Sequence, residues 1–287
     1  MSPKTKQLIL DKDALVGINI GDLCDFARNH FLLCSDTLLY ECATTSESER
    51  RNMLYRCDRL IKAGAYYCSC SIAFIQSESR NCLPYPWFLP DLKATEEIRT
   101  GEKPVEDLVD STTYGEISQP PYKVAKAFLD VSNKLKNRID LEDPHVREKI
   151  KQLPSDKLER LRELFERMDT QDLRQMCVDS VRGEWIKDRA KSGLSAEWMS
   201  WQRVRLTDAI MQNCYYLRLT GAMPKREVER VEHDYQDLEY VLLLSRADGI
   251  LTRDKKLVEP LARAAFPEKD VFSNLDEVPD EYLCHWS

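Results

Sequence analysis

Apolar runs and amphipathic stretches alternate over the first 75 residues. The runs at 7–10 and 31–35 are short and strongly apolar, and each precedes a stretch whose apolar positions have helical spacing. The pattern predicts strands at 7–10, 31–35 and 65–71, and helices at 20–30, 36–45 and 49–64, the last ending at Gly64. Strands that alternate with helices in this way are typical of a parallel α/β sheet.

The same rhythm returns at the end of the chain. A long amphipathic stretch at 225–249 precedes a short apolar run at 250–252, and a helix at 255–266 and a strand at 270–274 are predicted to follow. We therefore expect residues 1–75 and 225–287 to form one α/β core.

The middle of the chain, residues 76–224, has a different pattern. Six of the thirteen prolines lie between Pro84 and Pro121, where we expect neither regular helix nor central strand. Charged stretches with helical spacing follow, for example at 155–168 and 195–219. This part is predicted to be a proline-rich connection and a mainly α-helical insertion.

Composition narrows the class of protein. No apolar run of the 287 residues approaches the roughly 18 that a membrane helix needs, so we expect a cytoplasmic protein without a membrane partner. The ten cysteines are scattered and are expected to be reduced, with Cys68 and Cys70 packed on one face of a strand. A net charge of −7 argues against a protein that coats nucleic acid, but leaves room for an acidic pocket with a basic rim.

Candidate chemistry lies where the predicted strands end. Asp11 and Asp254 each directly follow a strand, and the carboxyl ends of parallel strands meet at one edge of a sheet. Glu41 lies in the helix after the second strand, and Asp237 lies in the helix before the run at 250–252. Crowded carboxylates repel one another unless a cation neutralises them. Oxygen ligands without His or Cys suit Mg²⁺ or Mn²⁺.

The order and setting of these acids resemble the PIN domain family of metal-dependent ribonucleases. The motifs that carry the resemblance are "LILDKDAL", "LLYEC", "DLEYVLLL" and "ILTRD". It implies a three-layer α/β/α sandwich around a parallel sheet, with catalytic and metal-binding roles for Asp11, Glu41, Asp237 and Asp254. Supporting roles are expected for Thr252, Asp13 and Asp234. Asp237 is preferred to Asp234 because its distance from Asp254, 254 − 237 = 17 residues, is close to the family's usual interval.

The resemblance implies an endoribonuclease in which one or two Mg²⁺ or Mn²⁺ ions activate water to cleave RNA. Weaker candidates for substrate phosphate contacts are Lys12, Arg253, Lys255 and Lys256. Lys12 and Lys256 also depart from the residue types frequent in the family, which leaves the number of ions open. RNA is the expected partner, and a homodimer and a protein inhibitor or partner stay open.

Two other functions are weighed beside the nuclease. An inactive PIN-like scaffold would bind RNA or protein through its insertion, with Trp185, Trp198 and Trp201 as contacts, although tryptophans at helical spacing more often pack in a core. A haloacid dehalogenase-type phosphatase would use Asp11 as nucleophile and Asp13 as acid and base. The stretch "ILTRDKKL" fits that phosphatase family poorly.

Overall fold

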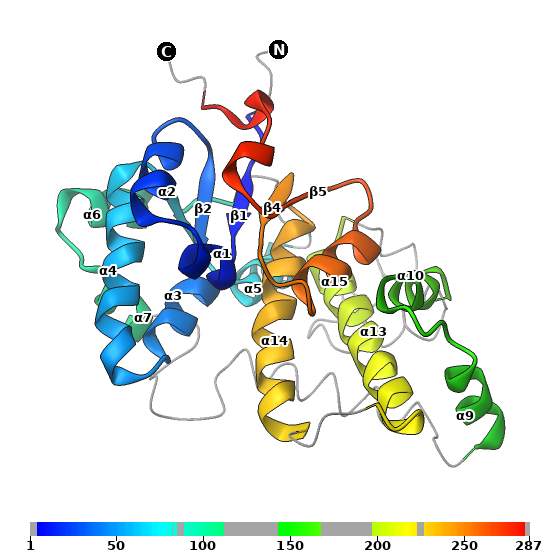
Figure 1. Cartoon of the computed structure of the whole chain (residues 1–287). Helices are drawn as coiled ribbons and strands as arrows, with labels where there is room; N and C mark the ends of the chain where they lie inside the picture. Colours follow the sequence, from blue (N-terminus) through cyan, green and yellow to red (C-terminus); the bar gives the residue numbers. More distant parts are fainter. Residues whose placement is uncertain are drawn as a thin grey trace.

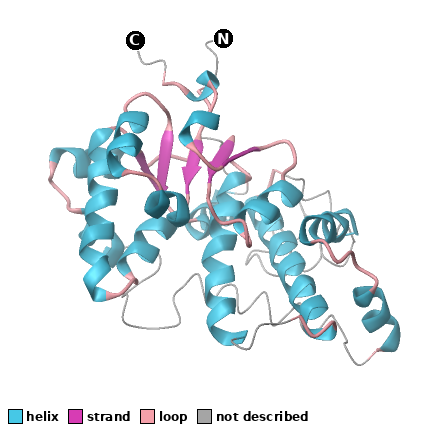
Figure 2. Ribbon diagram, viewed as in Figure 1, coloured by secondary structure: helices cyan, strands magenta, loops and turns pink. Residues whose placement is uncertain are grey.

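Five parallel strands form the centre of the protein, with helices on both sides, as Figure 2 shows. The computed structural model describes residues 5–81, 83–84, 89–111, 143–167, 197–222 and 227–284. The strand order is β3-β2-β1-β4-β5. The strands are β1 (Leu8–Leu10), β2 (Leu32–Ser35), β3 (Tyr66–Cys68), β4 (Gly249–Leu251) and β5 (Asp270–Phe272). The predicted α/β/α sandwich with a parallel sheet is confirmed.

The register of the two central strands determines what emerges at the edge of the sheet. All residues of β1 and β4 are buried, as expected for apolar strands covered on both faces. Leu8 pairs with Gly249 and Leu10 pairs with Leu251. The backbone N–H of Asp11 then donates to the Leu251 carbonyl at 3.2 Å. Asp11 and the segment after β4 are therefore neighbours at the carboxyl ends of the strands.

Helices cover the sheet and account for most of the remaining described chain. In Figure 1, α2 and α4 lie to the left of the strands, and α13 and α15 lie to the right. The α-helices are α1 (Lys12–Gly17), α2 (Ile20–Ala27), α3 (Asp36–Ala43), α4 (Glu47–Ala63), α5 (Ser71–Asn81), α6 (Leu92–Thr100), α7 (Val105–Ser111), α9 (Pro144–Lys151), α10 (Lys157–Arg167), α13 (Met199–Leu219), α14 (Glu227–Leu244) and α15 (Val258–Ala265). Two 3₁₀ turns, η1 (Leu275–Glu277) and η2 (Asp280–Tyr282), complete the described fold. None of the described helices is long and apolar enough to cross a membrane.

Helix ends follow the capping residues in the sequence. The Ser35 hydroxyl accepts a hydrogen bond from the Leu38 N–H at 3.2 Å and begins α3. Gly64 ends α4 with a φ of +143°, a conformation that disfavours any residue with a Cβ. A Cβ at Gly64 would also lie 2.5 Å from the Ala27 carbonyl oxygen, so this glycine lets α2 and α4 approach closely.

Two predictions for this part of the chain are wrong. The strand expected at 65–71 ends at Cys68, because helix α5 begins at Ser71 and Cys70 lies in the connection. Cys68 and Cys70 are nevertheless both buried. The proline-rich stretch contains the helices α6 and α7, because Pro90 and Pro104 lie just before these helices, where no intrahelical N–H is needed. The segment "ISQPPYK" lies outside the described residues.

The helices of residues 76–224 pack directly on the strand-bearing segments, and all five strands lie within residues 1–75 and 225–287. Helix α13 packs against α5 and α14, and α10 packs against α15. The buried Glu78 carboxylate of α5 accepts hydrogen bonds from the N–H groups of Met199 and Ser200 at 2.9 and 3.1 Å. Arg246 also pairs with Glu78 at 3.3 Å. Glu78 therefore joins α5 to the start of α13 and to the turn that follows α14.

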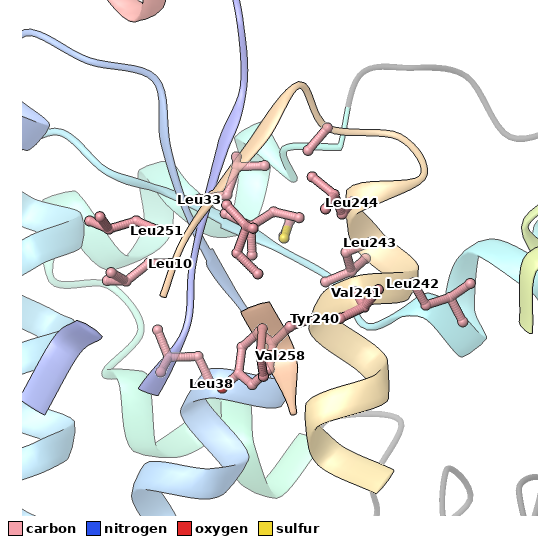
Figure 3. Packing of buried hydrophobic residues seen from close by; sticks show 14 of the residues in the cluster. Leu10, Leu33, Leu38, Tyr240, Val241, Leu242, Leu243, Leu244, Leu251 and Val258 are labelled. Carbon is pink, nitrogen blue, oxygen red and sulfur yellow. The ribbon is translucent and has the colours of Figure 1, made fainter. Parts of the chain in front are cut away.

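Helix α14 presents its apolar side to the sheet. Figure 3 shows Val241 and Leu244 of α14 on the side of the sheet where Leu33 of β2 lies, whereas Leu10 and Leu251 point away from α14. The helical spacing in this stretch predicts Tyr235, Leu238, Val241 and Leu242 on the inner side of the helix, and the last three are buried. The Tyr235 side chain lies outside the described residues.

Candidate functional site

A pocket of about 880 Å³ opens beyond the carboxyl ends of β1 and β4. The lining residues are Asp11, Lys12, Asp13, Glu41, Lys157, Asp237, Tyr240, Asp254, Lys255, Lys256 and Leu257. The four acids predicted to be catalytic come from four separate segments of the chain, and the fold places all of them in this pocket. Clefts at this position are where open parallel sheets bind ligands.

Asp11 lies at the base of the pocket and is 2% exposed. One of its carboxylate oxygens accepts from the Ala14 N–H at 3.0 Å and caps α1, and the other accepts from the Thr252 hydroxyl. Burial raises the pKa of Asp11 to about 7, although both hydrogen bonds act in the opposite direction. The Thr252 hydroxyl also accepts from the Asp254 N–H at 3.1 Å. Thr252 therefore connects Asp11 to the loop that carries the last acid.

Glu41 is 6% exposed and is held by a residue that the sequence analysis missed. Tyr240 projects from α14 toward α3, as Figure 3 shows, and its hydroxyl donates to the Glu41 carboxylate. Burial raises the pKa of Glu41 to about 7, while the Tyr240 hydrogen bond and the Lys12 charge lower it. Tyr240 follows Asp237 by three positions, so helical spacing could have indicated that both face the pocket.

The Asp254 carboxylate stabilises the turn before α15. Its two carboxylate oxygens accept from the backbone N–H groups of Lys256, Leu257 and Val258, at distances between 2.6 and 3.2 Å. These bonds shape the turn before α15, as a short acidic side chain often does. Any metal-ligand role of Asp254 would therefore compete with the bonds that hold this turn.

The remaining predicted acids differ in their positions. Asp237 is half-buried in α14 and lines the pocket, and Asp13 is exposed in α1 and also lines it. Asp234 lies in α14, one turn before Asp237, but its side chain is outside the described residues. The preference for Asp237 over Asp234 therefore stays a prediction.

The predicted phosphate contacts divide in a similar way. Lys12, Lys255 and Lys256 line the pocket. Arg253 does not line it: its guanidinium donates to the carbonyls of Gly17 and Ser273 and to the Asn274 side chain. These contacts join α1 to the segment after β5, so the structure gives Arg253 a role in the fold.

The donor atoms in the pocket are of the kind that a hard divalent cation takes, because the ionisable lining groups are carboxylates, lysines and Tyr240, without His or Cys. Two of the carboxylates are buried and their pKa values are raised, so a cation beside them would offset the cost of their charge. Within the described ranges, however, no set of three His, Cys, Asp or Glu side chains is already arranged to hold an ion. The residues fit a divalent ion in kind, and side-chain rotation would have to bring them together.

Comparison of the chain with protein-family models, with curated proteins and with solved structures found no match.

Proposed function

We propose that this protein is a metal-dependent nuclease, an endoribonuclease that hydrolyses RNA phosphodiesters. One observation carries the proposal: a single pocket at the carboxyl edge of the parallel sheet collects Asp11, Glu41, Asp237 and Asp254 from four segments of the chain. The PIN-like motifs of the sequence supply the reaction class, and the pocket supplies a place for it. The fold alone would not, because one fold hosts many functions.

Asp11, Glu41 and Asp237 are the residues proposed to hold Mg²⁺ or Mn²⁺, with Asp254 at the edge of the set. When bound, such an ion lowers the pKa of water and offsets charge on the phosphate. The Thr252 hydroxyl and the Tyr240 hydroxyl orient the Asp11 and Glu41 carboxylates. These hydrogen bonds hold the carboxylates in place before substrate arrives.

In the proposed reaction, a water oxygen forms a bond to phosphorus and the bond from phosphorus to the 3′ oxygen breaks. The products are a 5′-phosphate and a 3′-hydroxyl, and the proton lost by water is balanced by the proton gained at the 3′ oxygen. Lys12, Lys255 and Lys256 supply positive charge on the pocket wall for the phosphate oxygens.

The test is cleavage of labelled single-stranded RNA and DNA with Mn²⁺, Mg²⁺ or EDTA by the wild type, Asp237→Asn and Asp22→Asn. Asp237 lines the pocket, whereas Asp22 is an exposed acid on α2 outside the lining, so Asp22→Asn is the matched control. We expect metal-dependent cleavage of RNA that the control retains and Asp237→Asn loses by at least about a hundredfold. Cleavage by Asp237→Asn at the control rate would remove the proposed site.

The scaffold hypothesis has one observation in its favour, the engagement of Asp254 in the turn before α15. Against it, Trp198 and Trp201 are 8% and 4% exposed and so belong to the packed interior rather than to a docking surface. Trp185 lies outside the described residues. Binding of RNA without any cleavage would favour the scaffold. Release of inorganic phosphate from a phosphomonoester, with the oligonucleotide left intact, would favour the phosphatase.

A further inference from the structure

The pocket is lined by acidic and by basic side chains. The acidic side chains are Asp11, Asp13, Glu41, Asp237 and Asp254, and the basic ones are Lys12, Lys157, Lys255 and Lys256. Lys12 belongs with the acids, because its ammonium donates to the Glu41 carbonyl at 3.5 Å. Lys157 lies with the other lysines, because its ammonium donates to the Lys256 carbonyl. Lys157 and the pair Lys255 and Lys256, which are far apart in the sequence, therefore line the same pocket as the acids.

Lys157 is the first residue of α10, in the helical insertion, and its position is fixed by buried contacts. Arg160, which is 3% exposed, donates to the carbonyls of Pro154 and Ser155 at 2.7 and 2.8 Å. Its Nε also donates to the Asn213 side chain of α13 at 2.8 Å. These bonds hold the turn into α10 against the rest of the insertion. The packing of α10 on α15 then holds Lys157 over the loop that follows β4.

The three lysines offset the repulsion that the pocket carboxylates would exert on a polyanion. The chain carries a net charge of −7, and five carboxylates line the pocket, so a polyanion approaching it meets repulsion. A nucleic acid strand brings one negative charge per nucleotide, and each lysine that contacts a phosphate releases a condensed counterion. The cluster of Lys157, Lys255 and Lys256 provides local attraction beside the acids. Because the acids and this cluster line the same pocket, one strand can contact both.

Resting on the proposed nuclease function, we infer that Lys157 binds a phosphate next to the scissile one. The helical insertion is then part of the substrate-binding surface and holds single-stranded RNA across the rim of the pocket. Lys157 acts on binding and positioning and takes no part in proton transfer.

The experiment measures binding of a fluorescein-labelled single-stranded RNA by anisotropy, in Mn²⁺ and over a range of KCl concentrations. All proteins carry Asp11→Asn to block cleavage. Lys157→Gln is compared with Lys157→Arg, which keeps the charge, and with Lys149→Gln. Lys149 is an exposed lysine of α9, in the same insertion but outside the pocket lining, and α9 lies far from the strands in Figure 1.

Lys157→Gln should weaken binding about fivefold at low salt, and the slope of log affinity against log salt should fall by about 0.7, the value for one phosphate contact on a single strand. Lys157→Arg should restore most of the affinity, and Lys149→Gln should match the Asp11→Asn parent. In the background with Asp11 restored, Lys157→Gln should raise KM about as much as it weakens binding and leave kcat near the wild-type value.

Equal affinity and equal salt slope for Lys157→Gln and Lys149→Gln would overturn the inference, whether or not the wild type cleaves RNA. A complete lack of RNA binding by the parent would overturn it as well. If binding depends on Lys157 but the wild type shows no metal-dependent cleavage, the nuclease proposal fails and the phosphate contact stands. The two failures are therefore distinguishable.

Discussion

Replacing Asp11 with Asn should stabilise the metal-free protein, and the gain should depend on pH. The buried carboxyl has a pKa of about 7 in the fold, whereas the ordinary pKa of an aspartate side chain is 3.8. A raised pKa means that the folded state holds the proton more tightly than the unfolded state does. The stability that the neutral form contributes is fully present below about pH 3.8 and is lost as pH rises toward 7. Above pH 7 the wild type carries a buried charge that Asn lacks.

The shift of about three pH units corresponds to roughly 4 kcal/mol at pH 8, since each unit is worth about 1.4 kcal/mol. The Asn side-chain oxygen can still accept from the Ala14 N–H and keep the cap of α1. The Thr252 hydroxyl, in contrast, loses its carboxylate acceptor, which costs about 1 kcal/mol. A net gain of about 2 to 3 kcal/mol at pH 8 follows, and it should shrink to about 1 kcal/mol or less at pH 5.

The assay is denaturant-induced unfolding in EDTA at pH 5 and pH 8, with thermal melts alongside. A gain of about 2 to 3 kcal/mol should raise Tm by roughly 5 to 10 °C for a chain of this size. Asp22→Asn, at an exposed position, serves as the control and should change little at either pH. The reasoning is refuted if Asp11→Asn is no more stable than the wild type at pH 8, or if its gain is the same at both pH values.

Three further changes test other parts of the structure. Tyr240→Phe removes the hydrogen bond to Glu41, so it should lower the free energy of unfolding by about 1 kcal/mol in denaturant titrations. It should also lower kcat more than it raises KM, and an unchanged kcat would oppose a positioning role for Tyr240. Gly64→Ala should lower the free energy of unfolding by at least about 2 kcal/mol, because φ is +143° and the new Cβ would lie against the Ala27 carbonyl. Gly101→Ala, at φ +76° with open space around it, should lower it by about 1 kcal/mol. Equal losses of stability in urea titrations would contradict the close approach at Gly64. Glu78→Gln removes the buried carboxylate that pairs with Arg246, although the Glu197 charge still acts on Arg246, and should cost about 2 to 3 kcal/mol. Chemical denaturation measures this loss, and a variant as stable as the wild type would contradict it.

Local sequence pattern predicts the fold correctly where it coincides with backbone chemistry. The strands β1, β2 and β4 are short apolar runs, and the positions of Asp11 and Asp254 follow from the rule that parallel strands end at one edge. The turn-forming role of Asp254 is also local, because the N–H groups that it binds come within four residues of it.

Tertiary packing determines what the pattern leaves out. Lys157 reaches the pocket because α10 packs on α15, and nothing in the sequence around residue 157 indicates that neighbour. In the sequence, Tyr240 is one more apolar position of the predicted helix, and its hydrogen bond to Glu41 is evident only from the packing of α14 beside α3. The sequence does not tell whether Arg253 contacts a phosphate or the fold, because its charge is the same in both roles. Its bond to the Gly17 carbonyl is evident only from the packing of α1 beside the loop after β4.

The pairing of β1 with β4 has a consequence for how the protein is made. Leu8 pairs with Gly249, so the centre of the sheet joins segments from opposite ends of the chain. During synthesis, the first three strands leave the ribosome long before their central neighbour does, and β1 stays an unpaired edge until then. Asp237 and Asp254 also arrive with this last segment. A nascent chain that has not yet been translated to residue 237 therefore lacks Asp237 and Asp254, two of the five acids that line the pocket, and the pocket is completed only when β4 takes its place beside β1.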